Sequence, residues 1–272
     1  MDGIFKNSLI VFFLLSLMAC EVQEKKTEKE LPYAGDRLVV YGFVYSGSRI
    51  EVTVKRTLPL TCVSCDDTIS GVRVLLYEND QYLCDLVSAN GIQFFSPDTI
   101  IPNTDRLYKI EVSAPGLPSA RSDVINPIDA IVLDSISIGF SDSYTSLNFS
   151  FYKNDPGVGS YFYSLILQKK NGEKIKIYPF YLGYHSLFDV ADTGLIHRNF
   201  NFQMYRPEAS RLFFTLYRAD TQLVKYLKSL YDYESTFDDP YFDNPSLIYS
   251  NITGGYGIFA SMAADSCEVV LK

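Results

Sequence analysis

Residues 50–55 read IEVTVK, and this stretch decides the fold class of the chain. Ile50, Val52 and Val54 alternate with charged or hydroxyl-bearing residues. A period of two places alternate side chains on opposite faces of an extended backbone, so the stretch predicts a β-strand with one buried face and one wet face. The chain is also rich in tyrosine and phenylalanine, with 21 and 19 copies, and both residues favour strands.

Similar runs lie on both sides of this strand, separated by turn residues. Together with it, the predicted strands cover residues 37–44, 50–55, 72–76, 82–87, 92–95, 108–112 and 121–125. Short strands at this spacing are typical of an immunoglobulin-like β-sandwich. The cysteine and tryptophan marks of antibody domains are missing, so the sequence predicts the sandwich architecture alone.

The turn residues Asn126 and Pro127 separate this first set of strands from a second. The later predicted strands cover residues 136–140, 147–151, 160–168, 174–178 and 211–217. We therefore predict a mainly β protein with two domains. An immunoglobulin-like β-sandwich over residues 36–126 is followed by a second β-rich domain over residues 127–272, which carries one amphipathic helix.

The amphipathic helix is predicted over about residues 221–235. Asp220 or Thr221 can cap its amino end, and Leu223 and Leu227 fall on successive turns. We expect the helix to pack on a sheet through these leucines. A role at a membrane surface would require a basic face, and acidic residues near the end of the helix argue against one.

The amino terminus predicts the location of the protein. Residues 8–19 form an apolar block that is too short to cross a bilayer as a stable helix, and residues 17–20 read LMAC. These four residues resemble the lipobox read by the bacterial lipoprotein-processing machinery. We predict a signal peptide over residues 1–19, lipidation of Cys20 and a flexible charged tether over residues 20–35. The alternative is an ordinary signal peptide with Cys20 as a bystander.

Charge and composition exclude two classes of protein. The chain carries a net charge of −8 and no stripe rich in lysine and arginine, so it is a poor ligand for nucleic acid. Apolar residues make up 47% of its 272 residues, which excludes a mainly disordered protein. We expect a folded, acidic body attached to a membrane.

Four cysteines remain after Cys20, and outside the cytoplasm an even number favours disulfides. They are Cys62, Cys65, Cys84 and Cys267. Three pairings are open, and we predict one or two structural disulfides that hold the loop after the second strand. The spacing of Cys62 and Cys65 also suits a zinc site, but no second close pair follows. A redox role would require positive neighbours, whereas Asp66 and Asp67 follow.

The end of the helix and the residues after it combine aromatic rings with carboxylates. The predicted ligand patch consists of Tyr233, Phe237, Asp239, Tyr241 and Phe242. Such a set can stack on, and hydrogen-bond, a sugar or a peptide. The alternative, which we favour, is that the aromatic side chains pack the helix and the loop onto the sheet while the acids stay in water.

No established catalytic or cofactor motif occurs in the sequence. Its two histidines, His185 and His197, lie near Asp189 and Asp192 in a polar stretch that predicts a loop. We interpret the imidazoles as solvated, with a metal ion as the alternative, and we predict no metal and no cofactor. We predict that the protein is not an enzyme; a pair of carboxylates that meets only in the fold would be the exception.

Two stretches resemble a family of domains of unknown function. Residues 250–261 read SNITGGYGIFAS, and residues 38–44 read LVVYGFV. Both are similar to segments of outer-membrane lipoproteins of Gram-negative bacteria, which are often encoded beside TonB-dependent receptors. The resemblance implies an accessory role near an outer-membrane importer and no established catalysis.

The glycines of the SNITGGYGIFAS stretch predict a particular backbone conformation. Gly254, Gly255 and Gly257 stand before the apolar Ile258 and Phe259, which indicates a tight turn or positive φ angles before a buried strand. A phosphate-binding loop would require a strand before it, a helix after it and a nearby lysine. None of these is predicted here.

Three functions are compatible with these patterns. The first is a non-enzymatic lipoprotein of the outer membrane, periplasmic or surface-exposed, that assists a TonB-dependent receptor or binds its cargo. The second is an adhesin or a structural subunit of the cell surface, and the third is a hydrolase. We predict the first, with the membrane and a TonB-dependent receptor as partners.

Overall fold

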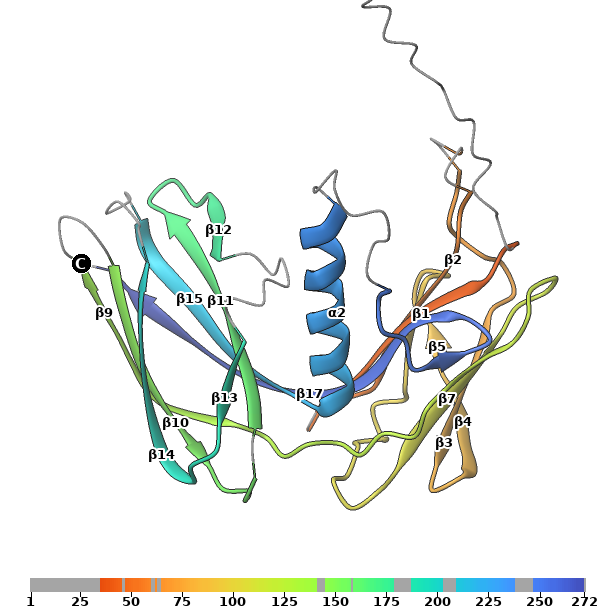
Figure 1. Cartoon of the computed structure of the whole chain (residues 1–272), viewed down its shortest axis with the longest axis horizontal. Helices are drawn as coiled ribbons and strands as arrows, with labels where there is room; N and C mark the ends of the chain where they lie inside the picture. The colour runs from red at the N-terminus through yellow and green to blue at the C-terminus, as the bar shows by residue number, and fades with distance from the viewer. Residues whose placement is uncertain are drawn as a thin grey trace, which may run out of the picture. The chain divides into compact units, whose positions relative to one another are not determined.

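The computed structural model describes most of the chain from Gly35 onward. The described residues are 35–45, 47–59, 62, 65–140, 145–157, 159–178, 187–202, 209–237 and 247–271. They form three β-sheets and the helix α2 (Thr221–Phe237), so the predicted mainly β class with one amphipathic helix is confirmed (Figure 1). Within these residues, no helix has the length and the apolar character needed to cross a membrane.

The largest sheet, sheet A, has nine strands in the order β12-β11-β15-β17-β1-β2-β6-β5, and β13 also pairs with β11. These strands are β1 (Leu38–Tyr45), β2 (Glu51–Arg56), β5 (Val87–Ser88), β6 (Gln93–Phe95), β11 (Gly159–Lys169), β12 (Lys174–Tyr178), β13 (Phe188–Val190), β15 (Ala209–Ala219) and β17 (Tyr256–Val270). The alternation predicted in the IEVTVK stretch is present, because Val52 and Val54 of β2 are fully buried.

Two smaller sheets pack against sheet A. Sheet B has the order β16-β8-β7-β3-β4, with β3 (Arg73–Glu78), β4 (Gln81–Asp85), β7 (Tyr108–Ser113), β8 (Ala120–Ser122) and β16 (Ile252–Thr253). Sheet C has the order β14-β10-β9, with β9 (Val132–Phe140), β10 (Thr145–Lys153) and β14 (Gly194–Phe202). Sheet B and the β1 side of sheet A enclose a first core around Leu38 and Tyr108. Sheet C and the β11 side of sheet A enclose a second core around Phe149 and Phe214.

Strand β17 connects the two halves of sheet A. Its first residues pair with β1 in parallel, and its last residues pair with β15 in antiparallel fashion. Phe259 belongs to the first core and Cys267 packs against the second, whereas Ile258 and Ala260 face α2. Because side chains alternate along a strand, sheets B and C cover one face of sheet A and α2 covers the other.

Strand β17 also bears on the predicted division of the chain into two domains. The division into residues 36–126 and 127–272 remains a prediction. Gly35–Lys272 forms one compact unit, and Ile252 of β16 and Phe259 of β17 join the first core although they lie near the end of the chain. The first core, which contains residues of β1, therefore also includes residues from the last segment of the chain.

The closing glycine-rich segment has the backbone predicted for it. Gly254 has a φ of 83° and Gly257 a φ of 117°, and both values lie in the region that favours glycine. Ile258 and Phe259, which follow, are fully buried. The segment therefore turns the chain sharply and inserts β17 between β1 and β15.

Candidate functional site

A row of aromatic side chains lies along one face of β1. Tyr41, Phe43 and Tyr45 stand two residues apart and pack in the cluster that includes helix α2, whereas Val40 and Val44 point into the first core. The strand therefore carries apolar side chains on both faces, and its second face needs a cover. Helix α2 supplies that cover.

Helix α2 is fixed to sheet A through its first turn. The Asp220 carboxylate accepts one hydrogen bond from the Leu223 backbone N–H and one from the Ser261 backbone N–H, each at 2.7 Å. Asp220 thus caps the helix and joins it to β17, as its position predicts. Burial raises the pKa of the Asp220 carboxyl, and its backbone hydrogen bonds oppose that shift. Leu223 and Leu227 face the sheet, as predicted.

A cavity of about 320 Å³ remains between α2 and this face of sheet A. Its lining consists of Tyr41, Phe43, Tyr45, Glu51, Thr53, Phe162, Leu223, Tyr226, Leu227 and Met262. A concave, mostly apolar cavity with a few polar groups is the usual form of a small-molecule site.

Besides tyrosine hydroxyls, the described lining of the cavity has two polar side chains, Glu51 and Thr53, from the neighbouring strand β2. Glu51 pairs with Phe43 across the two strands, and Thr53 pairs with Tyr41. Burial raises the pKa of Tyr45 to about 12, and the charge of Glu51 adds to the effect. Burial also raises the pKa of Tyr226, with Tyr41 as the second cause. The phenols of Tyr45 and Tyr226 therefore stay protonated at neutral pH and can donate hydrogen bonds.

We expect the Tyr45→Phe variant to lose less free energy of unfolding at alkaline pH than the wild-type chain loses. The folded chain holds the pKa of Tyr45 at about 12, above the usual 10.0. Between these values the unfolded chain has released a proton that the folded chain keeps, so the stability due to Tyr45 is complete below pH 10 and is lost as the pH rises toward 12. Urea unfolding at several pH values should show a smaller fall in the free energy of unfolding for Tyr45→Phe.

The matched control for this measurement is Tyr256→Phe, because Tyr256 lies on β17 with about half of its side chain exposed, 51%. This variant should keep the alkaline fall of the wild-type chain. Equal falls for the wild type and Tyr45→Phe would contradict the assignment of a buried phenol to the cavity.

The predicted ligand patch is only partly described. Tyr233 lies on α2 and is half-buried, and Phe237 is the last residue of the helix. Asp239, Tyr241 and Phe242 lie outside the described residues. The cavity residues were not among the predicted site residues, although a signal was present. In a strand with one buried face, alternate positions face solvent and are usually polar. In the segment from Tyr41 to Tyr45 these positions are aromatic, which indicates that the second face is also covered.

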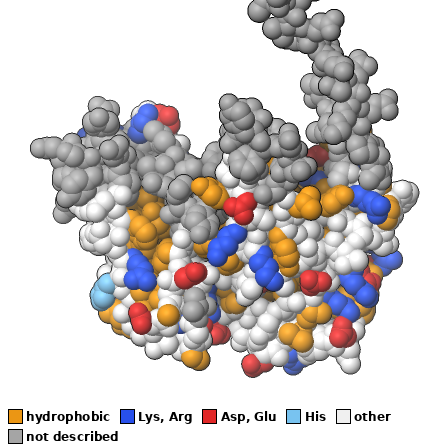
Figure 2. Space-filling view, in the orientation of Figure 1, with side chains coloured by type: hydrophobic (Ala, Val, Ile, Leu, Met, Phe, Trp, Pro, Cys, Tyr) orange, Lys and Arg blue, Asp and Glu red, His pale blue; other side chains and the backbone are white. Residues whose placement is uncertain are grey.

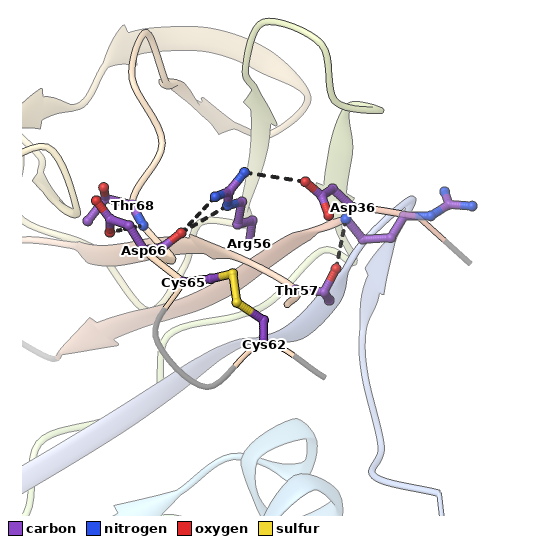
Figure 3. A network of polar contacts seen from close by, with 8 residues as sticks. Asp36, Arg56, Thr57, Cys62, Cys65, Asp66 and Thr68 are labelled. Atoms are coloured by element: carbon purple, nitrogen blue, oxygen red, sulfur yellow. Dashed lines mark hydrogen bonds and ion pairs between the residues drawn. A yellow bond between two sulfur atoms is a disulfide. The ribbon is translucent and has the colours of Figure 1, made fainter. Parts of the chain in front are cut away.

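A disulfide joins Cys62 and Cys65 in the loop after β2, with their Cα atoms 5.7 Å apart. Arg56, the last residue of β2, donates hydrogen bonds to the Asp66 backbone carbonyl at 2.8 and 3.1 Å and to the Asp36 carboxylate at 3.4 Å (Figure 3). The disulfide between Cys62 and Cys65 matches the prediction that a disulfide holds this loop. The Arg56 bonds tie the loop to the residues at which the folded body begins.

The other two cysteines, Cys84 on β4 and Cys267 on β17, are free thiols. They pack against different cores, which accounts for their separation. Burial raises the pKa of both thiols, and the charges of Asp85 and Asp265 raise it further. Both thiols are therefore protonated at neutral pH, a state that disfavours metal binding and nucleophilic attack.

The histidine and aspartate residues considered for a metal ion do not gather into one site. His197 lies on β14 of sheet C, so the loop predicted there is wrong: its residues alternate between the second core and solvent. Asp189 lies on β13 of sheet A and accepts a hydrogen bond from the Ser160 hydroxyl at 2.6 Å. His185 and Cys20 lie outside the described residues. In the part of the chain that is described, no three metal-ligating side chains form a group.

Comparisons with known proteins give one family. The model of a family described as "Domain of unknown function (DUF4249)" matches residues 24–268, and no curated protein matches the chain. A penta-heme cytochrome c552 from Thermochromatium tepidum is 13% identical, with a TM-score of 0.26 over 51% of this chain and 40% of that chain. A DUF3823 family protein from Parabacteroides merdae is 11% identical, with a TM-score of 0.23 over 68% of this chain and 92% of that chain.

Proposed function

Because this chain belongs to the DUF4249 family, a domain of unknown function, we propose a function for it from its cavity, its amino-terminal sequence and the resemblance described above. The protein is a non-enzymatic, ligand-binding lipoprotein of the outer membrane. It is anchored through Cys20 and presents a small molecule to, or receives one from, a TonB-dependent receptor. The aromatic cavity beneath α2 carries the ligand-binding part of this proposal.

The chemistry of the cavity favours binding over catalysis. In the lining that the structure describes, the walls are rings and aliphatic side chains, and the polar groups are tyrosine hydroxyls, Thr53 and one carboxylate, that of Glu51. General acid–base hydrolysis by carboxylates requires two such groups facing the substrate. An apolar wall with a few oriented polar groups suits recognition of a small molecule instead.

The structure offers a pair of variants that separates cavity binding from general effects on sheet A. Thr53 lines the cavity, and Thr53→Phe would fill part of it. Thr215 on β15 is also half-buried and lies outside the cavity lining, so Thr215→Phe introduces the same ring elsewhere on the sheet. A third variant, Cys20→Ser, removes the proposed site of lipidation.

The test is affinity purification of the full chain from detergent-solubilised membranes of its host, with mass spectrometry of both the proteins and the small molecules retained. The wild type and Thr215→Phe should carry a TonB-dependent receptor and a small molecule. Thr53→Phe should keep the receptor and lose the molecule, and Cys20→Ser should leave the membrane fraction and lose the receptor.

Each part of the proposal has its own contrary outcome. A small molecule that is absent from the wild type, or that Thr53→Phe retains in full, would contradict binding in the cavity. If no receptor co-purifies with the wild-type chain, the accessory role is contradicted and the adhesin hypothesis is favoured. A Cys20→Ser chain that still fractionates with membranes would contradict the lipid anchor.

A further inference from the structure

We propose that the cavity beneath α2 takes an organic cation, a small molecule with a positively charged nitrogen and an apolar body. This inference rests on the proposed ligand-binding function and specifies the chemical class of the ligand. Three features of the cavity support it: a carboxylate with no ion-pair partner among the described residues, a set of aromatic rings, and a described lining that contains no basic side chain.

The carboxylate belongs to Glu51, which is the one charged residue among the described residues that line the cavity. Glu51 is half-buried and, among the described residues, makes no ion pair. The two basic residues nearest to it in the sequence, Arg49 and Lys55, have other partners. Arg49 forms an ion pair with Asp98 at 3.5 Å, and Lys55 forms one with Asp67 at 2.6 Å. The Glu51 carboxylate is therefore available to a cationic ligand.

Aromatic rings form much of the remaining wall. Tyr41, Phe43 and Tyr45 come from β1, Tyr226 from α2 and Phe162 from β11. The rings of Tyr41 and Tyr226 are 6.4 Å apart and meet edge to face at 71°. The face of an aromatic ring attracts a cation, and several rings around one position form the usual site for alkylated ammonium groups.

Other ligand classes fit the cavity less well. An anion would meet the Glu51 carboxylate, and the part of the lining that the structure describes offers it no lysine, arginine or histidine. The chain also has a net charge of −8, which attracts cations to its surface and repels anions. On the face shown in Figure 2, acidic and basic side chains are interspersed without an extended patch of one sign.

A pair of probes isolates the charge of the ligand from its shape. Choline carries a quaternary nitrogen, and its uncharged carbon isostere has a carbon atom in that position. We would measure the binding of both probes to the chain from Cys20 onward by calorimetry. The wild type should bind choline about tenfold more tightly than the isostere, because both the rings and the carboxylate act on the charge.

Glu51→Gln should remove most of that preference by weakening choline binding, with binding of the isostere unchanged. Glu268→Gln is the matched control, because Glu268 lies on β17 outside the cavity and its replacement changes the net charge by the same amount. This control should keep the tenfold preference. Thr53→Phe should weaken the binding of both probes, which places them in the cavity.

The outcomes separate the two proposals. If the isostere binds as tightly as choline, or if Glu51→Gln leaves the preference intact, the cationic ligand is wrong and the cavity remains a binding site. If neither probe binds, or if Thr53→Phe changes nothing, the inference fails and the proposed ligand-binding function loses its support.

Discussion

Replacing Gly257 with alanine is expected to cost about 4 kcal/mol or more of folding free energy. Gly257 has a φ of 117°, which an alanine adopts only with strain. A Cβ atom at this position would lie 2.0 Å from the carbonyl oxygen of Val40 and 3.0 Å from its backbone nitrogen. These are backbone atoms of β1, so relief would require β1 and β17 to separate. Urea unfolding followed by circular dichroism measures the loss.

Gly172→Ala provides the control for this measurement. Gly172 also has a positive φ, 88°, but a Cβ atom there would meet nothing within 4 Å. The control therefore reports the conformational cost alone, about 1–2 kcal/mol. Equal unfolding midpoints for the two variants would show that β1 and β17 do not approach as closely as described.

Replacing Asn251 with aspartate is expected to cost about 3 kcal/mol, although the two side chains have nearly the same shape. The Asn251 side chain is buried and makes two hydrogen bonds with one residue of β17. Its amide group donates to the Phe259 carbonyl at 2.7 Å, and its carbonyl oxygen accepts from the Phe259 N–H at 2.8 Å. Aspartate cannot donate the first bond when ionised, and it places a charge beside a carbonyl oxygen in the core.

The control is Asn171→Asp, in the exposed turn between β11 and β12. There the side chain accepts a hydrogen bond from the Glu173 N–H at 3.0 Å, and a carboxylate can accept the same bond. We expect a change within about 0.5 kcal/mol. Thermal unfolding of both variants at neutral pH provides the comparison. An Asn251→Asp chain as stable as its control would mean that the Phe259 bonds contribute nothing net.

The aromatic cavity shows why one part of the site escaped prediction. The positions of Tyr41, Phe43 and Tyr45 follow from the alternation of β1, which the sequence displays. Their burial depends on α2, whose Leu223 and Leu227 come from far along the chain and close over the same face. A helix that packs on a sheet is predictable from its periodicity, but the face and strands that it covers are set by long-range contacts.

The sequence by itself determined the β class, the alternation of β2, the helix with its Asp220 cap and the glycine conformations, because each depends on neighbours within a few residues. It also carries the lipobox-like segment ending at Cys20, from which the membrane anchor remains a prediction. The tertiary structure alone decided that β17 pairs in parallel with β1, where Ser261 donates a hydrogen bond to Val44 across 217 residues of sequence. It also decided that a cavity lies beneath α2. No local pattern encodes these features, since they arise when segments distant in sequence compete for the same buried surface.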